Sequence, residues 1–135
     1  KNILEAMQFG FSAKKALLLL EENMTFRRIK IKGFTRRKNM QDVRSRIIGK
    51  EGKTKRTIEG ITNCLLFINE DENMVGIIGN ADVIEEATIA ITNIIKGSKQ
   101  ANVYNFLERM NASKKKLGED LGLKEREEEE FEEEE

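Results

Sequence analysis

Hydrophobic and polar positions follow a helical period at the start of the chain and then change to the alternation of a strand. Over residues 1–22 the apolar positions recur with helical spacing, with a break near Gly10, and Ser12 is placed to cap a second helical piece. The apolar residues of 26–31 alternate with arginine and lysine, which predicts a short, half-buried strand ending at Gly33. The N-terminal part is therefore expected to be a bent helical segment followed by a strand.

Two helices around a glycine loop are predicted in the middle of the chain. A loop over residues 34–38 leads into a segment, 39–48, whose apolar positions fall on one helical face. The stretch Gly49-Lys50-Glu51-Gly52 interrupts this pattern. A second helix is predicted over residues 53–62, and it should end at Asn63, because asparagine readily adopts the left-handed conformation that closes a helix.

The remaining pattern predicts a hairpin and one more long helix. Apolar strands at 64–68 and 74–79 are separated by a short polar turn. A strongly amphipathic helix then begins at Asn80 or Ala81 and stops at Gly97. The order strand, helix, loop, helix, strand, strand, helix predicts an α+β domain, with a three-stranded antiparallel sheet and helices packed on one face.

The formal net charge of zero conceals two oppositely charged regions. Residues 119–135 hold eleven acids and two bases, a net charge of −9, so the rest of the chain carries +9. Within residues 27–56, thirteen bases stand against Asp42 and Glu51, a net charge of +11. Such a positive block around a glycine loop is typical of a surface that binds a polyanion. The alternative interpretation is a solvated face balanced by an acidic tail.

Residue types that carry metal chemistry and acid–base catalysis are nearly missing. The sequence has no histidine and one cysteine, Cys64, so we expect no metal site, no cofactor and no internal disulfide, and Cys64 should be a small buried residue. The acids are densest in the C-terminal run rather than in a convergent cluster, so we expect no catalysis. No apolar run approaches the roughly 20 residues of a membrane span, and no membrane partner is expected.

Together these features resemble a type I KH domain over residues 25–97. The family's fingerprint is an apolar pair, a G-x-x-G loop, and apolar and threonine positions at fixed offsets, seen here at Ile47-Ile48, Gly49 to Gly52, Ile58, Thr62 and Leu66. Lys55 stands where the family has an apolar residue, and Asn63 stands where it has glycine. The resemblance implies a shallow groove for about four unstacked bases beside the loop.

A narrower resemblance is to the Dim/Partner-of-Nob family of small-subunit ribosome assembly factors, in its archaeal form. It is carried by "GKEGKTKRTIE" and by the flanks "EAMQFGFSAKKALLLLEEN" and "ANVYNFLERM". This resemblance implies that residues 1–24 are a helical remnant of a preceding KH-like domain and that 25–97 are the KH domain. A helical extension at 98–118 would follow. The acidic tail, 119–135, lies outside the resemblance and is expected to be disordered.

The family resemblance implies a non-catalytic RNA-binding role in small-subunit ribosome biogenesis and rRNA 3′-end maturation. The expected partners are single-stranded pre-rRNA near the 3′ end of the small-subunit RNA, a Nob-type PIN-domain endonuclease and other pre-ribosome factors. An archaeal-type protein would be cytoplasmic, and a eukaryotic one nucleolar and cytoplasmic. The alternative is the KH portion of an RNA-degrading enzyme, such as an exosome or polynucleotide phosphorylase subunit.

The predicted RNA-binding residues surround the glycine loop. Bases would neutralise phosphates, glycines would let the RNA backbone approach, and apolar residues would form the groove floor. The set is Arg44, Arg46, Ile48, Gly49, Lys50, Gly52, Lys53, Lys55, Arg56 and Leu66. Because the loop should be exposed, acidic replacement of both glycines is expected to leave the domain folded.

Several roles stay open at the level of sequence. The bases at 36–38 are equally suited to RNA and to a protein partner. Glu51 is expected to face solvent or to cap the second helix. Tyr104 is expected to pack rather than to stack on a base, and the acidic tail either is a solvated appendage or masks the basic groove.

Overall fold

The computed structural model describes residues 2–121, and its order of elements is that of the predicted α+β domain. The strands are β1 (Met24–Lys30), β2 (Leu65–Asn69) and β3 (Met74–Asn80). The helices are α1 (Asn2–Phe9), α2 (Ala13–Ala16), α3 (Met40–Ile48), α4 (Lys53–Thr62), α5 (Ile84–Lys96) and α6 (Gln100–Asp120). Short 3₁₀ turns cover Leu17–Leu20, Ile31–Gly33 and Lys50–Gly52.

The three strands form one antiparallel sheet in the order β1-β3-β2, so β2 is an edge strand. Phe26 of β1 and Leu65 of β2 both stand opposite Ile78 of β3. Successive residues of a strand point to opposite faces, and here both faces are covered. Ile77 packs into one hydrophobic cluster and Ile78 into another, so the sheet separates two cores.

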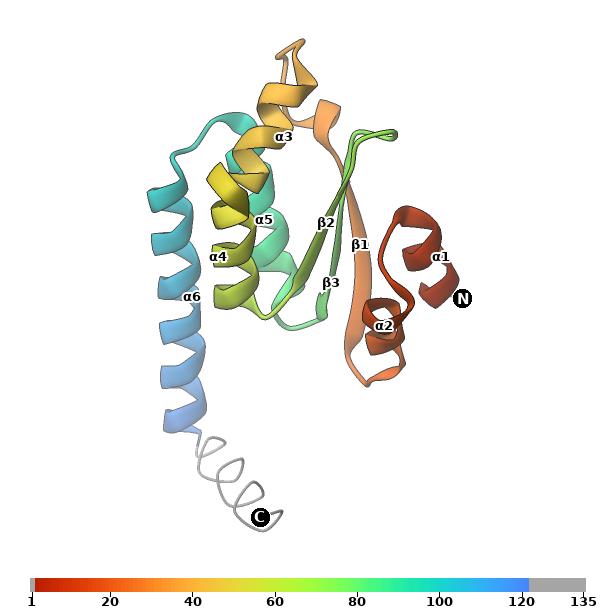
Figure 1. Ribbon diagram of the computed structural model, residues 1–135. Coiled ribbons are helices and arrows are strands. Elements are labelled where there is room, and N and C mark those ends of the chain that lie inside the picture. Colours follow the sequence, from red (N-terminus) through yellow and green to blue (C-terminus); the bar gives the residue numbers. More distant parts are fainter. Residues whose placement is uncertain (1, 122–135) are drawn as a thin grey trace.

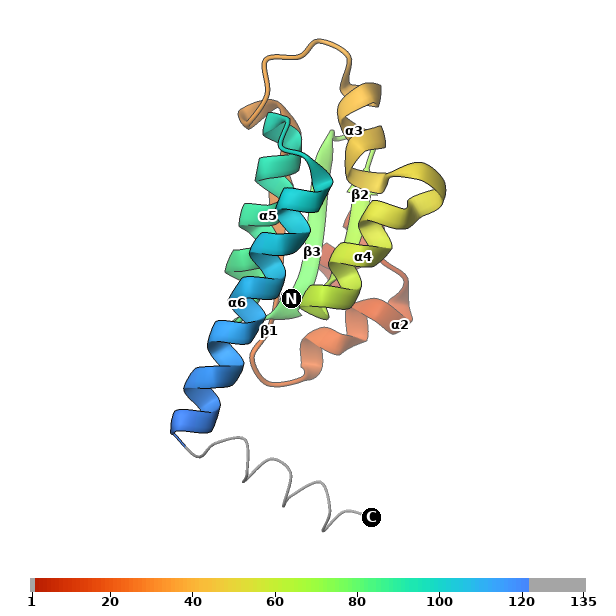
Figure 2. The same ribbon diagram turned by 90° about the vertical axis from the view of Figure 1, so that its left-hand side faces the viewer.

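The larger core lies between the sheet and a layer made of α3, α4 and α5, and α6 packs against the outer side of α4 and α5 (Figures 1 and 2). Ile47 of α3, Ile58 of α4 and Ile91 and Ile94 of α5 are fully buried in it. Val103 and Leu107 attach the first half of α6 to this layer. The helices on one face of the predicted sheet are therefore confirmed.

The second face of the sheet is covered by the N-terminal segment, which Figure 1 shows on the side opposite α4 and α5. Phe9 and Phe11 of this segment meet Phe26 of β1 and Phe67 of β2, with ring centroids 5.7–6.0 Å apart across the interface. Gly76 of β3 lies beneath these rings: a Cβ there would come within 3.0–3.1 Å of three of them. Residues 2–20 thus share a core with the sheet that they cover.

The strand boundaries differ from the sequence expectation by one or two residues, and differences of another kind occur at Ile31, Asn80 and Gly118. Ile31 belongs to a 3₁₀ turn rather than to β1, although it is fully buried. The helix expected from Asn80 or Ala81 begins at Ile84, after a turn in which the Asn80 side chain accepts a hydrogen bond from the Asp82 amide. The last helix continues past the expected end at Gly118 to Asp120, so the expectation of disorder from residue 119 is wrong for its first two residues. Residues 122–135 of the acidic tail lie outside the described residues. Among the described residues, no helix is long and apolar enough to cross a membrane.

Candidate nucleic-acid interface

The loop between α3 and α4 requires glycine for two different reasons. Gly49 has φ 77° and ψ 174°, and a Cβ there would lie 2.2 Å from Thr54 Oγ1 and 2.7 Å from the Thr54 backbone nitrogen. Gly52 has φ 77° and ψ 12°, but a Cβ there would meet nothing within 4 Å. The expectation that both glycines tolerate an acid is therefore wrong for Gly49, because Thr54 closes that space.

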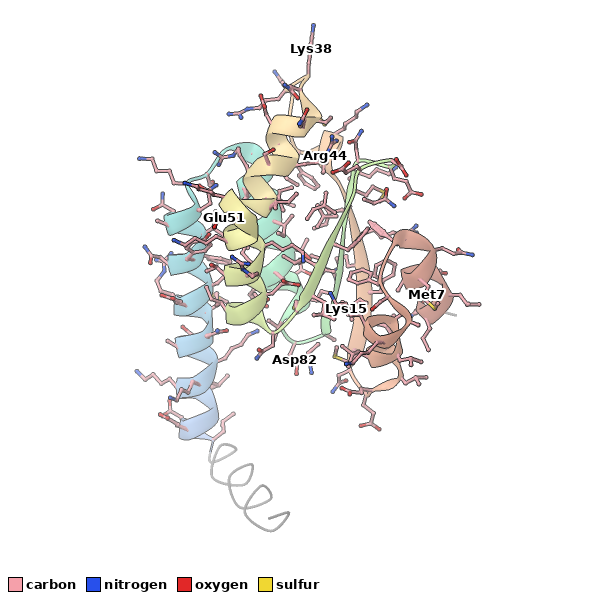
Figure 3. All side chains as sticks on the ribbon, viewed as in Figure 1. Met7, Lys15, Lys38, Arg44, Glu51 and Asp82 are labelled. Atoms are coloured by element: carbon pink, nitrogen blue, oxygen red, sulfur yellow. The ribbon has the colours of Figure 1, made fainter. Side chains whose placement is uncertain are left out.

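The first turn of α4 is open to an anion. Its N-cap residue, Gly52, provides no side chain to accept a hydrogen bond from the first amides of the helix. The Lys53 amide donates to the Lys50 carbonyl in the preceding 3₁₀ turn, whereas the amides after it in the first turn have no partner inside the helix. The helix dipole adds positive potential at this end. Glu51 is exposed and does not cap α4, and Figure 3 shows it at the junction of α3 and α4. The arrangement therefore offers donors to a phosphate group.

Three of the predicted bases surround this helix end without an acidic partner among residues 2–121. Lys50, Lys53 and Arg56 are all exposed, and they stand on the loop or within the first turn of α4. Lys55 belongs to the same turn but is half-buried, with its Nζ 3.6 Å from Glu59 Oε1. The loop thus gathers three free positive charges and one that is already paired.

The two arginines of α3 lie on different sides of that helix. Arg44 donates a hydrogen bond to the side-chain oxygen of Asn73, in the turn between β2 and β3 (Figure 3). Arg46 donates instead to the backbone carbonyls of Ile94 and Ser98, at the C-terminal end of α5. Cations are favourable at that end of a helix, so Arg46 stabilises the junction of α5 and α6. The structure does not bring Arg46 together with the loop bases.

The apolar residues predicted for the groove floor have different exposures. Ile48 is half-buried at the end of α3, as a floor residue should be. Leu66 is 1% exposed and belongs to the main core, so its side chain lines no surface and is not a floor residue. Ile68, two residues further along β2 on the same face of the sheet, is half-buried.

Glu59 is the residue of this region that the sequence pattern missed. Its Oε2 accepts a hydrogen bond of 3.0 Å from the backbone amide of Leu66, so its side chain joins α4 to the edge strand β2. Only the spacing of Lys55 and Glu59, four residues apart on one helix, signals the ion pair between them. Nothing in the sequence indicates the bond to β2, because it depends on how α4 packs on the sheet.

The other bases of the positive block divide between free and engaged side chains. Arg27 forms an ion pair of 2.6 Å with Glu85 of α5 and so serves the fold. The bases at 36–38 are exposed on the loop before α3, where Lys38 projects away from the domain (Figure 3).

Cys64 and Tyr104 lie where the sequence analysis expects them. Cys64 is 1% exposed, and burial raises the pKa of its thiol. Tyr104 is half-buried and packs against the main core. Among residues 2–121 no cluster of three or more Cys, Asp or Glu residues is placed to hold a metal ion.

The chain matches a family model for the second KH domain of PNO1, a eukaryotic-type KH domain (KH-domain type I), over residues 25–112. A curated relative, the KH domain-containing protein MJ0443 of Methanocaldococcus jannaschii, is 31% identical over 110 residues. That alignment covers 81% of this chain and 48% of the relative, so the chain spans about half the length of this relative.

Solved archaeal structures share the fold. A complex of a/eIF2alpha, aDim2p and rRNA from Pyrococcus horikoshii matches with a TM-score of 0.76 and 33% identity, over 83% of this chain and 60% of that chain. Dim2p of the same organism matches with a TM-score of 0.73 and 34% identity, over 80% and 62%. A protein of unknown function from Aeropyrum pernix matches with a TM-score of 0.83 and 31% identity, over 93% and 66%.

Proposed function

Because the chain belongs to the type I KH family, with the second KH domain of Dim2/PNO1-type ribosome assembly factors, we propose that it binds single-stranded RNA along α3, the Gly49–Gly52 loop and α4. The observation that carries the proposal is the uncapped N-terminus of α4, with Lys50, Lys53 and Arg56 exposed around it. Bases that repel one another at a helix end open to anions form a site that an RNA phosphate completes.

The parts of this site have separate tasks in RNA binding. The amides of the first turn of α4 donate to a phosphate, and Gly52 leaves the space beside them open to the RNA backbone. The three free bases neutralise the neighbouring phosphates. Ile48 and Ile68 offer half-buried apolar surface to unstacked bases, which is how KH domains hold single strands.

The RNA that we propose is the small-subunit ribosomal RNA near its 3′ end, bound without catalysis during rRNA maturation. Two observations support this choice: the family is that of ribosome assembly factors, and the solved P. horikoshii relative is in complex with rRNA. A Nob-type PIN-domain endonuclease would then act as the cutting partner. In this role the chain holds the RNA strand and the endonuclease supplies the chemistry.

The sharpest test of the loop is Gly52→Asp, with Gly60→Asp as its control. A Cβ at either position would meet no atom within 4 Å, so both variants add one carboxylate at a site with open space around its first side-chain atom. Asp is among the residues that best tolerate the left-handed conformation of Gly52. Gly60 lies eight residues further along α4, roughly 12 Å away at 1.5 Å per residue, which is beyond the reach of screened charges.

In a filter-binding titration with single-stranded RNA, we expect Gly52→Asp to weaken binding by at least about tenfold and Gly60→Asp by less than about twofold. Thermal melting of both variants confirms that they are folded. Equal affinities of the two folded variants would show that the loop is not the binding site. Crosslinking to total RNA with sequencing then identifies the RNA, and enrichment outside the small-subunit ribosomal RNA would reject the assembly role.

A further inference from the structure

The space between α4 and the edge strand β2 is bridged by one carboxylate. Glu59 Oε2 lies 3.0 Å from the backbone nitrogen of Leu66, and Glu59 Oε1 lies 3.6 Å from Lys55 Nζ. The Glu59 side chain is 19% exposed and that of Lys55 is 28% exposed, so both remain in contact with solvent. Each oxygen of this carboxylate therefore has a different partner, one on the sheet and one beside the phosphate site.

The hydrogen bond that the Leu66 amide donates to Glu59 shows which backbone group lies at the free edge of the sheet. Within residues 2–121, β3 is the only strand that pairs with β2, and the Leu66 amide donates to Glu59 on α4. This amide therefore points out of the free edge of the sheet, toward α4. Single-stranded RNA is recognised by hydrogen bonds to the Watson–Crick and Hoogsteen edges of its unstacked bases, and polar groups at this free edge are available to make them. Glu59 thus stands where a base would meet the protein.

We propose that Glu59 recognises a base of the bound RNA by accepting hydrogen bonds from it, and that Lys55 pairs with the Glu59 carboxylate as long as no RNA is bound. This inference rests on the proposed RNA-binding function. Lys55 stands in the first turn of α4, where an RNA phosphate would bind. A phosphate offers Lys55 a second anionic partner. When the Lys55 ammonium moves to the phosphate, Glu59 Oε1 loses its ion-pair partner and can accept hydrogen bonds from the base. Oε2 keeps the Leu66 amide and so fixes the orientation of the carboxylate.

The chemistry of a carboxylate predicts which base is preferred. A carboxylate only accepts hydrogen bonds, and its oxygens have two acceptor positions each, so Oε1 favours a base edge with adjacent donors even while Oε2 keeps the Leu66 amide. Guanine presents N1–H and N2–H₂ side by side, whereas adenine and cytosine each present an amino group next to an acceptor. Uracil presents one N3–H between two carbonyl oxygens, which repel a carboxylate. Glu59 therefore ranks guanine first and uracil last at this position.

The test compares base preference in the wild-type chain and in Glu59→Gln. The probes are oligouridine hexamers with a single guanine at each position in turn, and the hexamer of uridine alone. We expect the best guanine-containing hexamer to bind the wild-type chain about tenfold more tightly than oligouridine. Glu59→Gln keeps the shape of the side chain and an oxygen for the Leu66 amide, and we expect its preference to fall below about twofold. Glu108→Gln, an equal change of charge at an exposed position on α6, should keep the wild-type preference.

The outcomes separate this inference from the proposed function. If Glu59→Gln retains the wild-type preference, or changes the affinity for every hexamer by one common factor, Glu59 does not read a base. If RNA binding itself is insensitive to Gly52→Asp, the proposed function fails at the loop instead. Melting temperatures of Glu59→Gln and Glu59→Ala show whether the bond to Leu66 is also needed for folding, and the preference is compared only between folded variants.

Discussion

The two glycines of the RNA-binding loop should differ in how much stability they contribute, and single alanine substitutions measure the difference. At Gly52 the new methyl group enters open space, so the only penalty is the left-handed backbone, about 1–2 kcal/mol for a residue with a Cβ. Alanine restricts the unfolded chain, which returns about 0.4–1 kcal/mol where the native conformation permits it. We therefore expect Gly52→Ala to destabilise the domain by about 1 kcal/mol.

At Gly49 two penalties add. Its backbone, with φ 77° and ψ 174°, lies in a region that is essentially restricted to glycine and costs about 1–3 kcal/mol. The methyl group would also come within 2.2 Å of Thr54 Oγ1 and 2.7 Å of the Thr54 nitrogen, an overlap that only a shift of α4 relieves. Such overpacking typically costs about 1–3 kcal/mol. After the same unfolded-state return of about 0.4–1 kcal/mol, the expected destabilisation for Gly49→Ala is about 2–5 kcal/mol.

Urea denaturation followed by circular dichroism measures both free energies of unfolding under the same conditions. The expected result is a midpoint for Gly49→Ala well below that for Gly52→Ala, which itself lies slightly below the wild type. Equal losses at the two positions would show that Thr54 does not crowd Gly49, and the conformation of the loop described here would be wrong. RNA affinity is then compared between the folded variants, where Gly52→Ala should retain most of its binding because it adds no charge.

Three further results are expected. Lys53→Ala should weaken the binding of all single-stranded RNAs by similar factors and should flatten the slope of log affinity against log salt by about 0.7. A salt titration on two RNA sequences measures both effects, and an unchanged slope would show that Lys53 does not contact a phosphate. Arg46→Ala should lower the free energy of unfolding by about 1–2 kcal/mol in urea and leave the salt slope unchanged, because its guanidinium binds carbonyls at the end of α5; a reduced slope would place it in the RNA site instead. Removal of residues 122–135, which carry nine acids and two bases, should tighten RNA binding most at low salt, and equal affinities of the two chains at low ionic strength would show that these acids do not compete with RNA.

Local chemistry made the helical half of the fold predictable from the sequence. Ser12 caps α2 through a bond from the Lys15 amide, Asn63 takes a left-handed conformation after α4, and Gly97 does so after α5. Each of these signals acts within a few residues, so a single sequence contains it in full. The apolar faces of α3, α4 and α5 could be predicted equally well, because the helical period of their apolar residues indicates which face is buried.

Contacts between distant segments could not be predicted in the same way. The four phenylalanines at 9, 11, 26 and 67 meet only because the N-terminal segment folds back over the sheet, and their spacing along the chain gives no sign of this. The fingerprint position of Leu66 suggested a groove residue, but the alternation of β2 turns that side chain into the core and leaves only its amide at the edge. Arg46 was grouped with the loop bases by its place in the sequence, although its helix turns it toward α5.

Whether a basic side chain has an acidic or carbonyl partner within the domain indicates whether it stabilises the fold or is available to bind a ligand. Arg27 and Lys114 each have a carboxylate partner on α5, at 2.6 and 2.7 Å. Arg46 donates to backbone carbonyls at the C-terminal end of α5. Lys50, Lys53 and Arg56, in contrast, have no acidic partner among residues 2–121. Folding gains nothing from placing three unpaired cations around one helix end, since their mutual repulsion opposes it. Their position is explained by a polyanion that binds there. Replacing any one of these three residues with alanine should therefore flatten the slope of log affinity against log salt, whereas replacing Arg27 should leave that slope unchanged.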